Sequence, residues 1–195
     1  MSNAVYERSL PDTALRQGAL ISGLLHPYTT AESIADSEKL VVKHLEYPLA
    51  IIVSQDCDLD LEFNSRRGIP NESGNVPLRI KQITNILFCN VYLYIDARAD
   101  LGIDASTWRS LKSNSNERYQ YLREVSAIED ANQEGYAALV IDFKRHFSLM
   151  TDEAYAQVGK SAHRRCRLMS PYMEHLCSRF TRYISRVALP YAHEL

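Results

Sequence analysis

The sequence predicts an α+β fold in which a small β-barrel or a strongly bent antiparallel sheet is followed by C-terminal helices. Two long apolar runs, residues 47–53 and 86–95, are rich in β-branched and aromatic side chains and therefore indicate buried strands. After Met150 the apolar spacing changes to that of helices, starting with a hydroxyl cap and two acids at residues 151–153. Because the strands come before the helices, the order is typical of α+β proteins.

The remaining elements are predicted in chain order from apolar spacing and from turn residues. Strands are expected at residues 15–25 (ended by His26-Pro27-Tyr28), 40–45, 119–125 (edge-like), 136–143 and 147–150, with a tight turn at 144–146 joining the last two. Short helices are expected at 30–38 and 106–112, a turn-rich loop at 64–77, and a final helix from Ser170-Pro171 to about Ala188. This order indicates a β-barrel-like domain with loop and short-helix insertions at 5–150 and a helical extension packed on it at 151–195.

Size and composition are typical of a soluble globular protein. The chain has 195 residues, of which 46% are hydrophobic and 24% charged, and its formal net charge is −2. Its four cysteines form no C-x-x-C pair, and no apolar segment resembles a signal peptide or is long enough to span a membrane. We therefore expect a cytoplasmic protein with free thiols and no membrane partner.

The end of the central strand carries the densest group of carboxylates in the sequence. If the strand continues beyond Val53, alternation places Asp56, Asp58, Asp60 and Glu62 on one face. One hypothesis makes Asp56 and Asp58 the catalytic residues of a phosphodiester-processing, nuclease-like enzyme, acting with Mg²⁺ or Mn²⁺ or beside nearby arginines. The alternative is a solvated strand end that holds no metal or cofactor, and this is the first expectation.

Neither cysteine nucleophile chemistry nor a zinc site is favoured by the pattern. Cys57 lies between two carboxylates, which disfavour its thiolate, and alternation places it on the apolar face as a small buried residue. His175 and Cys177 are two residues apart in the predicted last helix, so their side chains cannot close on one zinc ion.

The C-terminal part of the chain is strongly basic. Between residues 160 and 186 there are seven Lys or Arg residues and one acid, which gives a local charge of +6. Guanidinium groups suit the phosphate oxygens of nucleic acid, and the alternative is a solvated face that pairs with the acidic remainder or with a partner subunit. The candidate nucleic-acid-binding residues are Arg164, Arg165, Arg167, His175, Arg179, Arg182 and Arg186.

Two groups of proteins share local features with this sequence. The order strand, loop, strand opening on Pro-Leu-Ala-Ile-Ile-Val-Ser (residues 48–54), further strands and terminal helix resembles the SH3-like barrels of the PemK/MazF toxin family over residues 15–150. That resemblance implies an endoribonuclease that cleaves RNA without metal and is held by an antitoxin, although Tyr47 stands where the family has its catalytic arginine. The motif Ser-Gln-x-Cys-Asp at 54–58 is similar to that of uncharacterised bacterial proteins, which implies a link to mobile-element or phage-defence loci.

Three functions therefore remain open from the sequence. The first is a bacterial protein of a phage-defence or toxin–antitoxin system that binds RNA, DNA, a protein partner or a second copy of itself as a homodimer. The second is the phosphodiester-processing enzyme based on Asp56 and Asp58. The third is a non-catalytic structural subunit of a larger assembly, in which the acidic and basic surfaces make protein contacts only.

Overall fold

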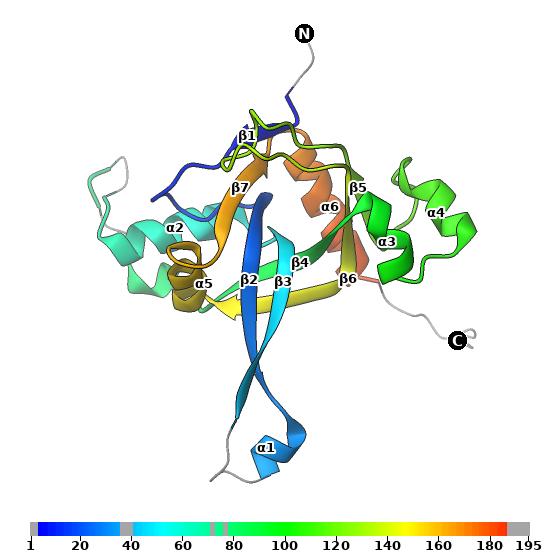
Figure 1. Cartoon of the computed structure of the whole chain (residues 1–195). Helices are drawn as coiled ribbons and strands as arrows, with labels where there is room; N and C mark the ends of the chain where they lie inside the picture. The colour runs from blue at the N-terminus through cyan, green and yellow to red at the C-terminus, as the bar shows by residue number, and fades with distance from the viewer. Residues whose placement is uncertain (1–3, 36–40, 71–72, 76–77, 187–195) are drawn as a thin grey trace, which may run out of the picture.

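The computed structural model describes residues 4–35, 41–70, 73–75 and 78–186, and in these ranges seven antiparallel strands form one sheet (Figure 1). The strands are β1 (Tyr6–Arg8), β2 (Ala19–Thr29), β3 (Val42–Ile52), β4 (Asn85–Leu93), β5 (Tyr119–Leu122), β6 (Leu139–Met150) and β7 (His163–Leu168). The helices are α1 (Ala31–Ala35), α2 (Asp56–Arg67), α3 (Tyr94–Asp100), α4 (Ala105–Leu111), α5 (Thr151–Val158) and α6 (Tyr172–Ile184), with a 3-10 turn η2 (Arg79–Lys81). The strand order is β1-β7-β2-β3-β4-β6-β5. The α+β prediction is confirmed in its bent-sheet form, because the sheet is open and does not close into a barrel.

Both faces of the central strands are buried, which explains why residues 49–53 are apolar without interruption. Leu49, Ile51 and Val53 belong to a cluster that includes Leu176 and Phe180 of α6. Ala50 and Ile52 face the other way, into a cluster that includes Leu59 of α2 and Ala154 of α5. The sheet is therefore covered by α6 on one face and by α2 and α5 on the other. For this reason every side chain of residues 49–53 is buried away from water.

The acidic stretch after Val53 is helical, and the prediction that the strand continues there is wrong. Helix α2 begins at Asp56 with two acids in its first turn, ends with Arg66 and Arg67, and is capped by Gly68 in the left-handed conformation. These charges are favourable at the two ends of a helix dipole, and a left-handed glycine is a common helix stop. The predicted division of faces is therefore also wrong: Glu62 is buried, whereas Cys57 is exposed.

Residues 139–150 form one strand, β6, instead of two strands around a tight turn at 144–146. Asn90 of β4 lies opposite Asp142 and the preceding Cys89 lies opposite His146, so residues 143–145 have no partner on β4. This bulge reverses the alternation of β6. Phe143 packs on the α6 face, whereas Phe147 lies on the opposite face, with its ring centroid 5.3 Å from that of Phe88.

Strand β7 was not predicted, and it lies inside the sheet between β1 and β2. Leu168 lies opposite Tyr6, and Arg167 lies opposite Ala19. The two helices expected after Met150 are confirmed as α5 and α6, but β7 between them makes residues of the 151–195 range part of the central sheet.

The remaining predicted elements agree with the structure apart from their limits. The strand predicted at 15–25 is β2, which continues through His26-Pro27-Tyr28 to Thr29, and the strands predicted at 40–45 and 47–53 are one strand, β3. The edge strand predicted at 119–125 is β5, which lies at the end of the sheet, and the short helices are confirmed as α1 and α4. Helix α6 ends at Ile184, earlier than predicted, and the predicted end at about Ala188 lies outside the described residues.

Two left-handed glycines provide a test of the loop geometry. Gly135 has φ +72°, and a Cβ atom there would lie 2.7 Å from the Val125 carbonyl oxygen, whereas Gly68 has φ +65° with no heavy atom within 4 Å of such a Cβ. We expect Gly68→Ala to lower the free energy of unfolding by about 1 kcal/mol through backbone strain alone. Gly135→Ala should lower it by about 2–3 kcal/mol, because strain and a backbone clash add. Urea denaturation would measure both values, and equal losses would contradict this structure of the 125–136 loop.

Candidate functional site

Asp56, one of the two predicted catalytic residues, is held by three donors from other parts of the chain. The Arg16 Nε donates to its Oδ1 at 2.8 Å, the Gln17 backbone N–H donates to the same oxygen at 3.0 Å, and Arg167 donates to Oδ2 at 3.2 Å. Burial of Asp56 would raise its pKa, but the hydrogen bonds from Arg16 and Gln17 and the charge of Arg167 outweigh burial and lower the pKa. Asp56 is therefore a stable carboxylate anchor.

Asp58 does not join Asp56 in this arrangement. In helix α2 residues two apart point in nearly opposite directions, whereas residues four apart share a face. Accordingly Asp60, and not Asp58, lies beside Asp56 at Arg16, with the Arg16 Nη1 atom 3.5 Å from the Asp60 carboxylate. Asp58 is exposed to solvent. Within the described residues, no group of three or more His, Cys, Asp or Glu side chains is placed to hold a metal ion.

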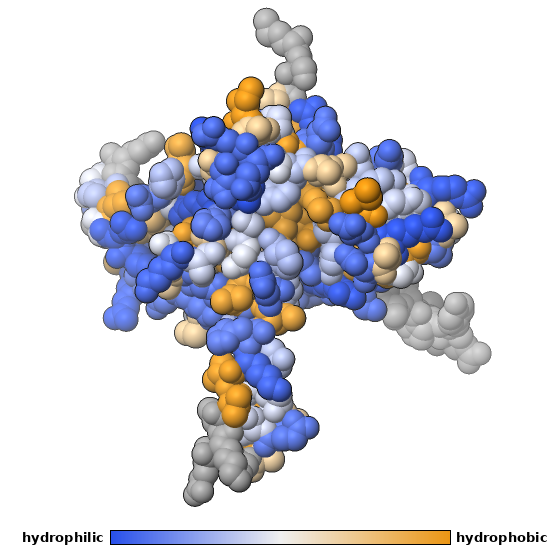
Figure 2. Space-filling view, viewed as in Figure 1, coloured by the Kyte–Doolittle hydropathy of each residue, from blue (hydrophilic) through white to orange (hydrophobic). Residues whose placement is uncertain are grey.

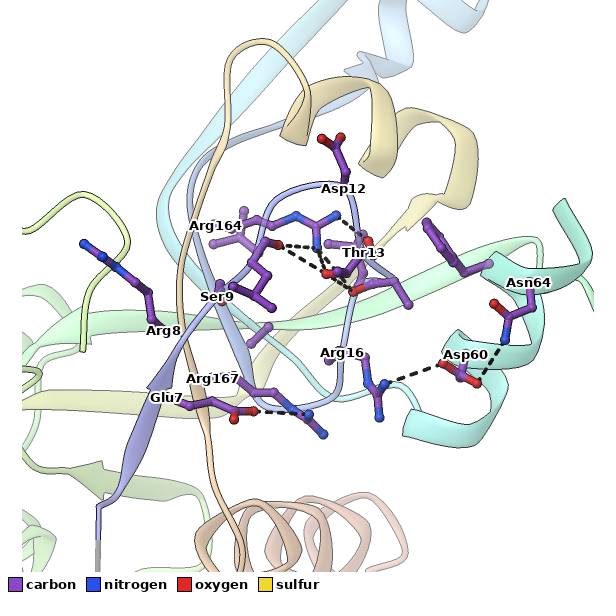
Figure 3. A pocket seen from close by; sticks show the side chains of 16 residues that line it. Glu7, Arg8, Ser9, Asp12, Thr13, Arg16, Asp60, Asn64, Arg164 and Arg167 are labelled. Atoms are coloured by element: carbon purple, nitrogen blue, oxygen red, sulfur yellow. Dashed lines mark hydrogen bonds and ion pairs between the residues drawn. The ribbon is translucent and has the colours of Figure 1, made fainter. Parts of the chain in front are cut away.

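A pocket of about 420 Å³ opens beside this cluster, between the 9–16 loop, α2 and β7 (Figure 3). Two of its arginines are already paired with carboxylates. Arg167 is 3.3 Å from Glu7, and Arg16 bridges Asp56 and Asp60.

Arg164 donates to backbone carbonyls of the 9–16 loop, at 2.8 Å for Thr13 and 3.2 Å for Ala14. Burial lowers the pKa of Arg164, which has no carboxylate partner in the described structure. Arg164 and Arg167 are therefore used within the fold, where they hold the N-terminal loop onto β7.

Arg165 is more deeply buried than these arginines, and its guanidinium is also bound within the fold. Its guanidinium donates two hydrogen bonds to Asp130, at 2.8 and 2.7 Å, and one to Glu134 at 2.7 Å. The side chains of Arg165 and Asp130 are 7% and 0% exposed. Burial would raise the pKa of Asp130, but the hydrogen bonds from Arg165, Gly135 and Asn132 lower it to about 2. Arg165 is therefore a structural residue of the sheet.

The predicted basic face of α6 is divided between bound and free side chains. Arg179 is half-buried and donates to the backbone carbonyls of Asn116 at 2.6 Å and Tyr119 at 2.7 Å, which attaches α6 to the chain before β5. Arg186 is exposed and lies 3.4 Å from Glu117. His175 and Arg182 are exposed, and the Arg182 guanidinium has no acceptor among the residues that the structure describes. Thus the structure separates Arg164, Arg165 and Arg167, which are bound around β7, from the exposed side chains of α6.

The β6 bulge adds cations that the sequence analysis missed. Lys144 and Arg145 project from the bulge beside the buried carboxylate of Asp142, to which Arg118 donates two hydrogen bonds at 2.8 and 2.6 Å. Arg145 also lies 3.8 Å from Asp142 and donates to the Tyr92 hydroxyl at 3.1 Å. The bulge packs against α6, because the Phe143 and Phe180 ring centroids are 5.8 Å apart. The turn predicted at 144–146 did contain these cations, but only the packing of β6 on α6 shows that they adjoin the basic helix.

The Arg165–Asp130 pair gives a stability prediction. Asp130→Asn should lower the free energy of unfolding by about 3 kcal/mol, because it removes the buried countercharge of Arg165 and leaves only Glu134, whose side chain is 67% exposed. The folded-state pKa of Asp130 is depressed to about 2. Its contribution is therefore complete above the unfolded-state pKa of about 3.9 and is lost as the pH falls toward 2. Chemical denaturation at several pH values should show this loss in the parent protein and not in Asp130→Asn.

Asp58→Asn is the matched control, since it removes the same charge from an exposed position. It should change the free energy of unfolding by less than about 0.5 kcal/mol. If Asp130→Asn behaves like this control, the pair does not carry the stability assigned to it.

The chain's own geometry is the basis for assigning a function. Comparisons with protein-family models, curated proteins and solved structures found no match. None of the helices in the described ranges combines the length and apolar character needed to cross a bilayer. The resemblance to the PemK/MazF toxins stays a prediction.

Proposed function

We propose that this protein is a nucleic-acid-binding module that contacts phosphates through a basic surface formed by the β6 bulge and helix α6. We define the basic surface as the exposed side chains Lys144, Arg145, Arg182 and Arg186. To these we add Arg118 and Arg179, which are partly buried and are bound within the fold. The observation that carries the proposal is the convergence of these six cations from three parts of the chain. Only two carboxylates, Asp142 and Glu117, pair with them in the described structure.

Some cations of the basic surface have carboxylate or hydrogen-bond partners in the described structure and others have none. The cations without partners favour binding of an external anion. Asp142 is fully buried and already accepts the two bonds from Arg118, so it only partly compensates Arg145, which is 53% exposed. Lys144 and Arg182 are exposed, and neither side chain has a hydrogen-bond acceptor among the described residues. When exposed, uncompensated guanidinium and ammonium groups neutralise phosphates, the counterions condensed on the nucleic acid are released, which is the main source of non-specific affinity.

Aromatic rings lie beneath the arginines and hold them in place. The Arg145 guanidinium carbon is 6.0 Å from the Tyr92 ring centroid, and that of Arg186 is 5.6 Å from the Tyr183 ring centroid. A cation held over an aromatic face is restricted in its motion, so less conformational entropy is lost when it binds. Planar guanidinium groups also pair with phosphate oxygens through two hydrogen bonds, which an ammonium group cannot do.

The proposed surface keeps some of the nucleic-acid-binding residues predicted from the sequence. Its centre lies at α6 and the β6 bulge instead of at the arginines of β7. Arg179 and Arg182 of α6 and Arg186 just after it are kept, whereas His175 is not part of the basic surface. Arg118 and the bulge residues Lys144 and Arg145 are added. Arg164, Arg165 and Arg167 are assigned structural roles because their donors are used within the fold.

The proposal is tested by the anisotropy of labelled single-stranded RNA, single-stranded DNA and duplex DNA titrated with the full chain at several salt concentrations. We expect binding that weakens steeply with salt. The combined variant Lys144→Ala/Arg145→Ala/Arg182→Ala should weaken it at least about tenfold and should reduce the slope of log K against log salt by about 2 to 3. Such changes would follow from the loss of phosphate contacts.

The control variant is Arg79→Ala/Lys81→Ala/Lys160→Ala, which removes three exposed cations outside the basic surface. It changes the net charge by the same amount and should leave the salt slope nearly unchanged. Equal effects of the two variants would indicate general charge attraction and contradict a localised surface. Absence of salt-dependent binding to any of the three nucleic acids would refute the proposed function.

A further inference from the structure

Strands β2 and β3 continue beyond the sheet as a two-stranded arm, which we define as residues 25–35 and 41–47 and which includes α1 (Figure 1). Among the described strands, β7 pairs with β2 only as far as Ser22, and β4 pairs with β3 only from Ala50 to Ile52. The arm therefore has two outer edges that no neighbouring strand covers within the described ranges. Uncovered edges are sites of pairing with other chains unless they are blocked.

The outer edge of β2 is blocked. The Gln157 side chain of α5 accepts a hydrogen bond from the Leu25 N–H at 2.8 Å and donates one to the Leu25 carbonyl at 2.6 Å. Both backbone groups of Leu25 therefore point away from β3. Since outward and inward residues alternate, Pro27 also occupies an outward position, where a missing N–H breaks no bond to β3.

The outer edge of β3 is open by the same alternation. Leu25 lies opposite Glu46, Pro27 opposite His44 and Thr29 opposite Val42. Val42, His44 and Glu46 therefore direct their N–H and C=O groups outward. No hydrogen bond to these groups occurs within the described part of the chain, and no proline interrupts residues 42–47.

The arm also exposes several large apolar side chains. Tyr28, Val42 and Leu45 are 45%, 52% and 50% exposed, and Figure 2 shows hydrophobic side chains gathered on the arm. A two-stranded ribbon is only marginally stable in water, and further strands are needed for a stable sheet. An added strand would cover the open edge and shield part of Val42 and Leu45.

We propose that a second copy of this chain supplies that strand, with the two β3 edges pairing antiparallel about a two-fold axis at His44. Centred on His44, the pairing lets all three outward residues exchange backbone hydrogen bonds with the partner. It places Val42 opposite the partner's Glu46 and Lys43 opposite the partner's Leu45. Apart from the two His44 side chains at the axis, no like charges face each other, and residues 42–47 carry one Lys and one Glu. The edge is thus self-complementary, as a closed two-fold dimer requires.

The self-pairing is tested by measuring the molar mass of the full chain with light scattering after size exclusion. The parent protein should be a dimer. His44→Pro should be a monomer, because it removes an outward N–H and blocks the edge while leaving the bonds to β2 in place, as Pro27 does on the opposite strand. His44→Thr keeps the N–H and should remain a dimer. A monomeric parent, a dimeric His44→Pro or a monomeric His44→Thr would each overturn the proposal.

A cross-linking experiment covers the case in which His44→Pro fails to fold. In a Cys57→Ser/Cys177→Ser background, His44→Cys places two thiols at the axis, within the Cα separation that a disulfide allows. Mild oxidation should give a covalent dimer, whereas Lys160→Cys in the same background should give none. Absence of the cross-link, or equal cross-linking at both positions, would refute edge pairing at His44. Neither experiment depends on nucleic-acid binding.

Discussion

The buried pair between Arg165 and Asp130 is the interaction on which the arrangement of the sheet depends. Arg165 sits in β7, and Asp130 sits in the loop between β5 and β6, so the pair joins segments 35 residues apart. A guanidinium at 7% exposure is tolerated only with a countercharge and satisfied hydrogen bonds. Asp130 supplies the countercharge and accepts the hydrogen bonds, and its carboxylate also accepts hydrogen bonds from the backbone N–H groups of Asn132 and Gly135. The same pair therefore ties β7 to the loop between β5 and β6 and sets the shape of that loop.

Sequence reasoning predicted the parts of the fold that follow from local patterns. The central strands, α5, and the start of α6 were found because apolar spacing and capping residues are local signals. It failed at α2, where a row of acids was read with the period of a strand although Arg66, Arg67 and Gly68 signal a helix end. It failed at β7 because a strand with three arginines is buried only when distant acceptors exist. Those acceptors, Asp130, Asp56 and the carbonyls near Thr13, are brought together by the fold alone.

The same reason explains how the candidate sites changed. A count of charges along residues 160–186 cannot distinguish a guanidinium that meets a carboxylate from one that meets water. In the structure Arg165, Arg167 and Arg179 are held by acceptors from other segments, whereas Arg182 is not. Conversely, Lys144 and Arg145 project from the surface because of a bulge in β6. The register shift at Cys89 that defines this bulge has no recognisable pattern in the local sequence. Free cations, and not total cations, determine where a polyanion can bind.

The two surfaces inferred from the structure are physically compatible. In Figure 1 the arm projects away from the body of the protein, whereas α6 packs on the sheet at the other end of the molecule. A second copy paired along β3 would therefore leave the basic surface of each copy exposed. Two such surfaces on one particle would make the second contact with a long nucleic acid intramolecular, so the apparent affinity would exceed that of either surface alone. The gain would require a strand long enough to reach both surfaces, and short oligonucleotides would bind each copy independently.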